Sequence, residues 1–403
     1  MTSATGTVLA WLLERSHDAS ARQIPALTDQ AARRLGLGGT RLYLADVQQV
    51  RLLALPQLAA PRPGPAEASE ADREAEVLEI DGSLAGMAYR TQRTQLSRDR
   101  TTAWVPMIDG VERIGVMKAT GAELGRAELD VCGALASLAT LVVVSKSSHN
   151  DILVVRGRSR PMTLQAELVW GFLPPRTIGT SQATSTAVLE PAYDIGGDAF
   201  DHNFSDGVLH LTLLDAMGHD LASGGASSAG LAACRSTRRS GGTLTDIAGT
   251  IERTLQEWIP DRLMTGILAN LDTADGEFTW VNCGHPPPLL IRNGHVLPEA
   301  LERAAQLPFG VGFHGQDAPR QYRVRLQPGD RVLIYSDGVI EARSAAGELF
   351  GEERLADTVI RSMASGATAP EALRRLILDL LNHQDQRLLD DATILLSEWH
   401  PTG

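Results

Sequence analysis

The sequence predicts an α+β protein built from two parts that differ in how strands and helices alternate. Residues 7–35 read as two helices, and several strands then lead to a long apolar helix that ends near residue 146. From about residue 180 the chain consists of many short strands with turn signals, interrupted by helices in two blocks. This grouping is typical of stacked antiparallel sheets covered by helices. We therefore expect a smaller α+β domain followed by a larger layered one.

The elements of the N-terminal part follow from apolar periodicity and turn residues. A Pro-rich and then acidic stretch at 60–76 predicts a mobile loop between two strands. Asp109-Gly110 lies between two apolar runs and indicates a hairpin. The expected elements are helices within 7–35, strands at 40–47, 50–56 and 76–80, a short helix within 83–97, strands at 103–108 and 112–119, and a helix at 122–146.

The C-terminal part contains strands bounded by turn dipeptides. Asp206-Gly207 and Asn293-Gly294 each separate two apolar runs, as in tight hairpins. The expected elements are strands at 184–195, 198–204 and 208–215, helices at 222–239 and 245–258, strands at 266–272, 277–284, 287–298 and 330–337, helices at 352–364 and 370–383, and a last strand at 391–399.

Composition and charge exclude several classes of protein. The net charge of −12 argues against a nucleic-acid-binding protein, because phosphate binding needs a basic surface. Three scattered cysteines, Cys132, Cys234 and Cys283, fit a reducing compartment. The N-terminus lacks the basic start and apolar core of a signal peptide, and no apolar run is expected to span a bilayer. We therefore expect a cytoplasmic protein without a membrane anchor.

The stretch PAYDIGGDAFD at 191–201 places Asp194, Asp198 and Asp201 around two adjacent glycines. A single acid beside a glycine is ordinary turn chemistry. A Gly-Gly pair also lets the backbone come close to another group. Several acids beside bare backbone suggest a hard cation, although this stretch alone does not decide the matter.

The register of one predicted hairpin brings two acids together. If Asp206-Gly207 is a two-residue turn, Asp198 lies directly opposite Asp215 on the neighbouring strand. Like charges in this position destabilise a sheet, and a bridging divalent cation would reverse the penalty. The alternatives are that both acids are solvated at strand ends, or that a longer turn breaks the register.

Further acids at strand ends make a carboxylate cage the better interpretation. Asp337 follows the apolar strand RVLIY, just as Asp215 follows LHLTLL. Asp390 and Asp391 come immediately before ATILLSE. One such acid would be a turn residue, whereas several in one domain indicate a shared site for a cation that prefers oxygen ligands.

The N-terminal part resembles a known sensor module. With GSLAGMAYRTQRTQL and WVPMIDGVERIGVM in this order of elements, residues 8–148 resemble a GAF domain, a small α+β module that binds ligands or dimerises. A structural domain without a ligand is the alternative. Residues 149–179 are then a linker or switch-helix region, in which Leu164 and Leu168 share one helical face. A passive linker is the alternative there, and a homodimer through the sensor and this helix is an expected assembly.

The C-terminal part resembles the bacterial metal-dependent serine/threonine phosphatases of the PPM family, in their SpoIIE-type branch. The motifs YDIGGDAFD, LLDAMGHD, NCGHPPPLL, QLPFGVGF, LQPGDRVLIYSDGVIEAR, GELFGEERL and LDDATILL occur in the family's order over about 160–400. The resemblance implies an α-β-β-α sandwich over 180–400, with two Mn²⁺ or Mg²⁺ ions at one edge of the sheets.

The resemblance also implies roles for individual residues. The catalytic metal ligands are expected to be Asp198, Asp215, Asp337 and Asp390, together with the carbonyl of Ala216. Residues with a supporting or open role are Asp194, Gly197, His219, Asp220, Gly338 and Asp391. Family members commonly have Gly in place of Asp220, so this acid could alter metal affinity or repel a phosphorylated substrate. His219 and His285 are expected to orient loops, with contact to phosphate or to the leaving group as the alternative.

The function implied by the resemblance is hydrolysis of phosphoserine on a regulatory protein. The two ions would activate water for in-line attack, so no covalent nucleophile is needed. The branch typically acts on an anti-sigma-factor antagonist, and the N-terminal sensor would control the reaction. The alternative is a degenerate protein that binds a phosphoprotein without turnover.

Overall fold

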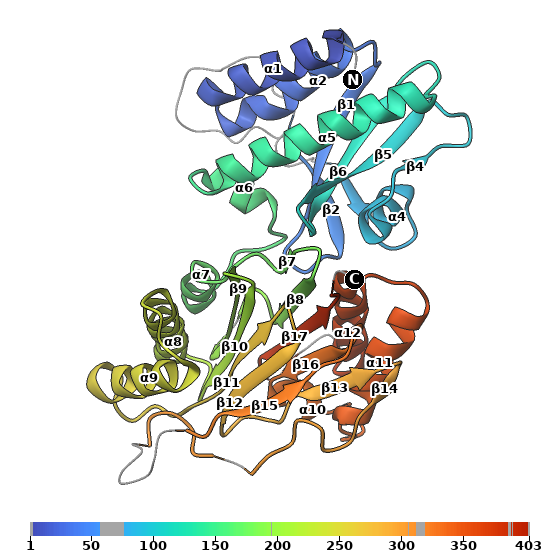
Figure 1. Ribbon diagram of the computed structural model, residues 1–403. Coiled ribbons are helices and arrows are strands. Elements are labelled where there is room, and N and C mark those ends of the chain that lie inside the picture. The colour runs from blue at the N-terminus through green and yellow to red at the C-terminus, as the bar shows by residue number, and fades with distance from the viewer. Residues whose placement is uncertain are drawn as a thin grey trace. The chain divides into compact units, whose positions relative to one another are not determined.

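The computed structural model of the protein describes residues 3–56, 76–194, 196–304, 306–311, 319–385, 388 and 390–401. The chain divides into two compact units, Met1–Arg160 and Pro161–Gly403 (Figure 1). The segment 149–179, expected to join two domains, is therefore shared between the units. The loop expected at 60–76 lies outside the described residues except for Glu76.

The first unit contains an antiparallel sheet with the strand order β3-β2-β1-β6-β5-β4. The hairpin expected near Asp109-Gly110 is confirmed, because Asp109 pairs with Glu112 and Gly110 has a positive φ of 60°. The elements are α1 (Ser3–Asp18), α2 (Ile24–Arg34), β1 (Gly39–Ala45), β2 (Arg51–Ala54), β3 (Val77–Glu79), α4 (Leu84–Thr91), β4 (Gln95–Leu96), β5 (Thr102–Asp109), β6 (Glu112–Thr120), α5 (Arg126–Ser147) and α6 (Asp151–Arg156).

Each face of this sheet has its own apolar core. On β1, Leu42 and Leu44 pack with α1, α2 and α5, whereas Tyr43 packs with α4. By length and composition alone, helix α5 could cross a membrane. This corrects the expectation that no apolar run is long enough to span a bilayer. Its buried side chains, among them Leu135 and Val143, lie in the core of the unit, as in the core helix of a folded domain.

The second unit contains two antiparallel sheets, ordered β15-β12-β11-β10-β9 and β14-β13-β16-β17-β8-β7 among the described residues. Its strands are β7 (Thr177–Gly179), β8 (Ala183–Glu190), β9 (Asp198–Ser205), β10 (Val208–Ala216), β11 (Met264–Asp272), β12 (Glu277–Cys283), β13 (Leu289–Arg292), β14 (His295–Val296), β15 (Tyr322–Arg325), β16 (Arg331–Tyr335) and β17 (Ala392–Trp399). Its helices are α7 (Leu164–Trp170), α8 (Leu221–Arg239), α9 (Leu244–Trp258), α10 (Asp337–Ile340), α11 (Gly351–Ala364) and α12 (Ala369–His383).

The two sheets stack between helices, which confirms the predicted layered fold (Figure 1). Alternate residues of β17 show this, because Leu395 packs toward the first sheet and its neighbours Ile394 and Leu396 pack toward α11 and α12. Helices α8 and α9 cover the outer face of the first sheet. The order is thus helices, sheet, sheet, helices.

Helix α7 belongs to the second unit but packs differently from the expectation. Ala166 and Val169 are its buried residues, and both lie in the core beside α8. Leu164 is 68% exposed and Leu168 is partly exposed, so the face that they share is not the face that packs on the core. The Trp170 indole donates a hydrogen bond to the carbonyl of Ala192 (2.8 Å), which ties α7 to the loop before β9.

Candidate metal centre

The β9–β10 hairpin has the predicted register. Asp206 and Gly207 form the turn with φ values of 49° and 80°, as a type I′ turn requires. Ser205 then pairs with Val208, and Asp198 pairs with Asp215 at the far end of the hairpin. The two carboxylates therefore project from neighbouring strands on the same face of the sheet.

The other predicted acids lie at the same end of the two sheets. Asp337 opens α10 directly after β16 ends, and Asp390 comes just before β17 begins. Strands β16 and β17 are paired neighbours, with Tyr335 opposite Ile394. Because β16 ends and β17 begins at the same edge of the sheet, Asp337 and Asp390 lie close together.

The pKa values of the acids show that their charges act on one another. Burial, together with the charges of Asp337, Asp390 and Asp391, raises the pKa of Asp215 to about 7. The pKa of Asp198, which is only 1% exposed, lies well above its ordinary value because of burial and of the Asp215 charge. Burial and Asp390 likewise raise the pKa of Asp337. The acids thus form a cluster of negative charge, hereafter the carboxylate cluster, which consists of Asp198, Asp215, Asp337, Asp390 and Asp391.

The described part of the chain gives the two opposed acids of this cluster no cationic side chain as a partner. Among the described residues Asp198 and Asp215 form no salt bridge, and the buried Oδ2 atom of Asp198 has no hydrogen-bond partner. Ser336 and Thr393 approach the Asp198 carboxylate and offset only part of its unfavourable burial. An orphaned buried carboxylate oxygen is costly, and a bound cation would remove that cost.

The donor set fits a hard divalent cation, although the side chains are not already gathered around one point. The carboxylates and the carbonyl of Ala216 offer only oxygen, which suits Mg²⁺ or Mn²⁺. Within the described ranges no group of three or more His, Cys, Asp or Glu side chains is placed to hold a metal ion. Mutual repulsion of the acids gives a physical reason for the open arrangement, since a cation would have to draw them together.

Asp391 performs a different task from the other acids. Its carboxylate accepts hydrogen bonds from the backbone N–H groups of Gly196 (2.8 Å), Gly197 (2.7 Å) and Asp198 (3.0 Å). Three backbone donors fix the entry into β9, so Asp391 orients Asp198. Asp194, in contrast, is exposed.

The glycines allow close backbone approach at this edge. A Cβ atom on Gly197 would lie 1.9 Å from the carbonyl oxygen of Ala216, and one on Gly196 would lie 2.3 Å from the Cα atom of His219. A Cβ atom on Gly338 would lie 2.0 Å from the carbonyl oxygen of Asp391. Any other residue would push these loops apart and separate the acids.

Two further acids singled out in the sequence, Asp201 and Asp220, lie outside the carboxylate cluster and have arginine partners. Asp201 is buried and paired with Arg235 (2.6 Å) and Arg238 (2.8 Å) of α8, so it has its own cations. Asp220 is the N-cap of α8 and pairs with Arg262. Sequence reasoning did not predict either arrangement, because the arginines belong to no motif and only the fold brings them near.

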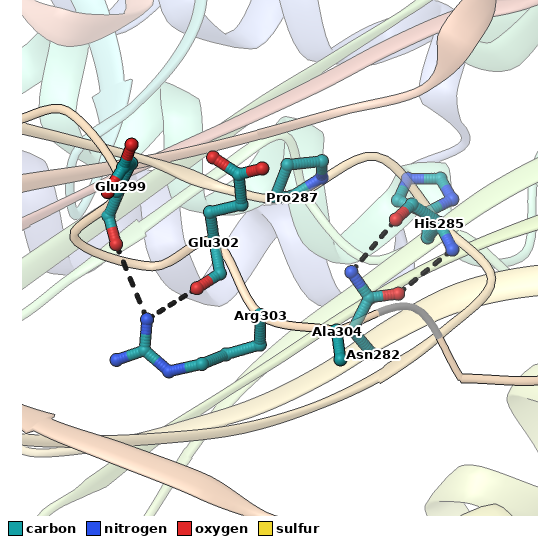
Figure 2. Close-up of a pocket in the computed structure, with 7 residues that line it drawn as sticks. All are labelled: Asn282, His285, Pro287, Glu299, Glu302, Arg303 and Ala304. Carbon is teal, nitrogen blue, oxygen red and sulfur yellow. Dashed lines mark hydrogen bonds between the residues drawn. The ribbon is translucent and has the colours of Figure 1, made fainter.

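His285 orients a loop and is not suited to donate a proton at neutral pH. Burial lowers its pKa to about 3, so the ring is neutral. Its Nδ1 atom lies 2.7 Å from the Thr265 hydroxyl, and Thr265 is the strand partner of Asp215. Asn282 holds the His285 backbone through two hydrogen bonds, next to a cavity of about 760 Å³ (Figure 2). His219, in contrast, is exposed in the loop before α8.

Comparison with known proteins finds similarity in the C-terminal region. Residues 205–400 match the stage II sporulation protein E (SpoIIE) family, a range that contains Asp215, Asp337, Asp390 and Asp391. The chain is 24% identical over 212 residues to the phosphoserine phosphatase RsbU of Bacillus subtilis, covering 52% of this chain and 61% of RsbU. It is 25% identical over 126 residues to protein IcfG of Synechocystis, covering 31% of this chain and 19% of IcfG. The chain thus spans less than two thirds of each of these relatives.

Solved structures resemble the same region. The RsbU and RsbW domains of a Mycobacterium tuberculosis protein align with a TM-score of 0.45 and 26% identity, covering 55% of this chain and 63% of that chain. The SiaA-PP2C domain of Pseudomonas aeruginosa aligns with a TM-score of 0.49 and 19% identity, covering 58% and 94%. The family match is the most specific of these findings, because residues 205–400 of this chain are similar to the SpoIIE family over most of the C-terminal unit.

Proposed function

We propose that the C-terminal unit is a metal-dependent protein serine/threonine phosphatase that hydrolyses phosphoserine on a regulatory protein. The observation that carries the proposal is the opposed pair of a buried Asp198 and a half-buried Asp215, which lie at a sheet edge with further acids and without a cationic partner among the described residues. The match to the SpoIIE family supports it, as does the similarity to a phosphoserine phosphatase.

In this proposal the residues of the chain hold and orient the catalytic ions. Asp198, Asp215, Asp337 and Asp390 bind them, together with the carbonyl of Ala216. When bound, two Mn²⁺ or Mg²⁺ ions would supply an activated water and positive charge for the phosphoryl group. Asp391 keeps the backbone before β9 in place through its three N–H contacts.

The substrate and the regulation are also part of the proposal. The substrate is a phosphorylated anti-sigma-factor antagonist, a class suggested by the family branch. The GAF-like first unit is the sensor, and it acts through α7, which contacts both α8 and the loop before β9. Leu141 is a large apolar residue exposed on α5, which supports a homodimer through the sensor. The buried thiols of Cys132, Cys234 and Cys283 suit a cytoplasmic location.

A phosphoprotein-binding protein without turnover is the competing function, and no observation favours it, because every predicted acid is present. Hydrolysis of p-nitrophenyl phosphate by the full chain, with and without Mn²⁺, separates the two. We expect Mn²⁺-dependent turnover that Asp215→Asn lowers at least a thousandfold. Turnover that is independent of metal, or equal in the variant, would contradict the proposal.

A further inference from the structure

The Asp220 side chain points into a network of hydrogen bonds at the start of α8. Its Oδ1 atom accepts hydrogen bonds from the backbone N–H of Ser223 (2.9 Å) and from the Ser223 hydroxyl (2.8 Å). Its Oδ2 atom accepts a hydrogen bond from Arg262 (2.7 Å). The Ser223 N–H and the Arg262 guanidinium hold the pKa of this carboxyl below its ordinary value. Asp220 is thus a helix cap whose charge is balanced.

Arg262 joins this cap to the loop that follows Ala216. Its Nη1 atom donates a hydrogen bond to the carbonyl of Met217 (3.1 Å), while its Nη2 atom contacts Asp220. The Ser223 hydroxyl also contacts the Met217 carbonyl (3.1 Å). A planar guanidinium that spans two acceptors fixes their separation better than a single contact does.

Gly218, in the loop between these two acceptors, has no room for a side chain. Gly218 has a φ of +99°, and a Cβ atom there would lie 3.0 Å from both the Arg262 guanidinium and the Ser223 hydroxyl. The backbone N–H of Met217 donates to the carbonyl of Leu263 (2.9 Å), so the residue after Ala216 is held on both sides.

From this geometry we propose that the Asp220–Arg262 ion pair is a positioning device that holds the Ala216 carbonyl and the Asp215 carboxylate ready for the cation. The inference rests on the proposed metal-dependent function. It assigns Asp220 a role opposite to the repulsion expected from its charge. Without the pair, the loop would have to become ordered when the ion binds, and metal affinity would fall.

The test compares Mn²⁺ binding by the full chain and by three variants, using titration calorimetry. Asp220→Asn keeps a capping side chain but removes the charge that Arg262 contacts. Asp220→Asn combined with Arg262→Gln removes both charges and leaves the net charge unchanged. We expect both variants to bind Mn²⁺ about 10-fold or more weakly, the usual scale for residues that support metal ligands. The third variant, Arg262→Lys, keeps the charge but loses the fork, and should fall between wild type and the double variant.

A matched pair elsewhere in the unit is the control. Arg325 of β15 and Asp275 of the turn between β11 and β12 form an exposed ion pair of the same length (2.7 Å) at the opposite end of the sheet. Asp275→Asn combined with Arg325→Gln should leave Mn²⁺ affinity unchanged. Melting temperatures without metal are measured in parallel, and we expect little change in any variant because exposed ion pairs contribute little to stability.

The outcomes separate this inference from the proposed function. Wild-type affinity in the charge-balanced double variant would show that only charge matters and would overturn the positioning role. Variants with lower melting temperatures but unchanged affinity would make the pair purely structural, which also overturns it. A wild-type chain that binds no Mn²⁺ would refute the metal-dependent function itself, and the inference with it.

Discussion

Strand β9 contains three titratable residues, Asp198, Asp201 and His202, and each is accommodated in a different way. Asp201 faces α8 and has two arginines as partners. His202 lies between the sheets, where its Nε2–H donates to the carbonyl of Pro175 (2.7 Å) and Ser185 lies 2.9 Å from its Nδ1 atom. Asp198 is as buried as the other two but has no cationic side chain beside it among the described residues.

The comparison shows where the fold supplies its own counter-charge and where it does not. Despite burial, Arg235 and Arg238 keep the pKa of Asp201 below its ordinary value. The pKa of Asp198 lies far above its ordinary value, since its neighbours are also acids. The chain therefore completes the Asp201 site by itself, whereas the carboxylate cluster would be completed by the cation that we propose it binds.

The largest expected effect on stability comes from breaking the completed site. Asp201→Asn leaves two guanidiniums near each other without their anion, and we expect a loss of about 3–5 kcal/mol in the free energy of unfolding. Urea unfolding without metal measures it. The control is Asp357→Asn, which breaks the exposed pair with Arg361 and should cost less than about 1 kcal/mol. Similar losses in the two variants would contradict the contrast between a buried and an exposed pair.

The buried, neutral imidazole of His202 predicts that the stability of the fold depends on pH. Burial lowers the pKa of His202 to about 4, below the value of about 6.5 in an unfolded chain. The unfolded chain therefore takes up the proton first as the pH falls. The stabilisation from neutral His202 is complete above pH 6.5 and is lost between pH 6.5 and pH 4, by about 3 kcal/mol in total.

His202→Gln tests this pH dependence, because glutamine can donate and accept hydrogen bonds but does not titrate. Between pH 7 and pH 4, the free energy of unfolding should decrease less in the variant than in the wild type. Parallel pH curves for the two proteins would show that His202 does not titrate as described.

A smaller effect on stability is expected from a substitution in α7, which packs near both the Asp201 site and the carboxylate cluster. Val169 of α7 is buried. A Cβ atom added to Gly224 of α8 would lie 3.4 Å from the Cγ2 atom of Val169 and close to the carbonyl oxygen of Gly196. The carbonyl of Phe172, just after α7, accepts a hydrogen bond from Arg235 (2.6 Å).

Val169→Ala should therefore cost about 1–2 kcal/mol of stability. We also expect it to lower turnover severalfold, because α7 would hold the loop before β9 less firmly. Leu164→Ala is the control, since this exposed side chain should change neither quantity. Unchanged turnover in Val169→Ala would leave α7 without influence on the site.

The strand-end acids were predictable from the sequence because strand pairing is a local rule. One turn, Asp206-Gly207, sets the register of the hairpin and so brings Asp198 opposite Asp215. The layered fold was predictable for the same reason, from strands and turns in order. The roles of the acids as metal ligands remain a prediction.

The partners of the acids were not predictable, because they come from distant elements. Asp201 seemed equivalent to Asp198 in the sequence, and only the packing of α8 on the sheet gives it Arg235. Asp220 seemed a disturbing charge, since Arg262 lies 42 residues away. For α7, the residue spacing predicted that Leu164 and Leu168 share one face of the helix. It did not show which face of the helix packs against the core.

The most direct test of the account is the stability of the full chain with and without Mn²⁺, in the wild type and in Asp215→Asn. Without metal, we predict that Asp215→Asn melts at a higher temperature than the wild type, because it removes one of the charges that repel Asp198 and Asp337. Excess Mn²⁺ should raise the melting temperature of the wild type and leave that of the variant unchanged. A variant that is destabilised without metal, or that gains as much from Mn²⁺ as the wild type does, would contradict the claim that the carboxylate cluster awaits a cation.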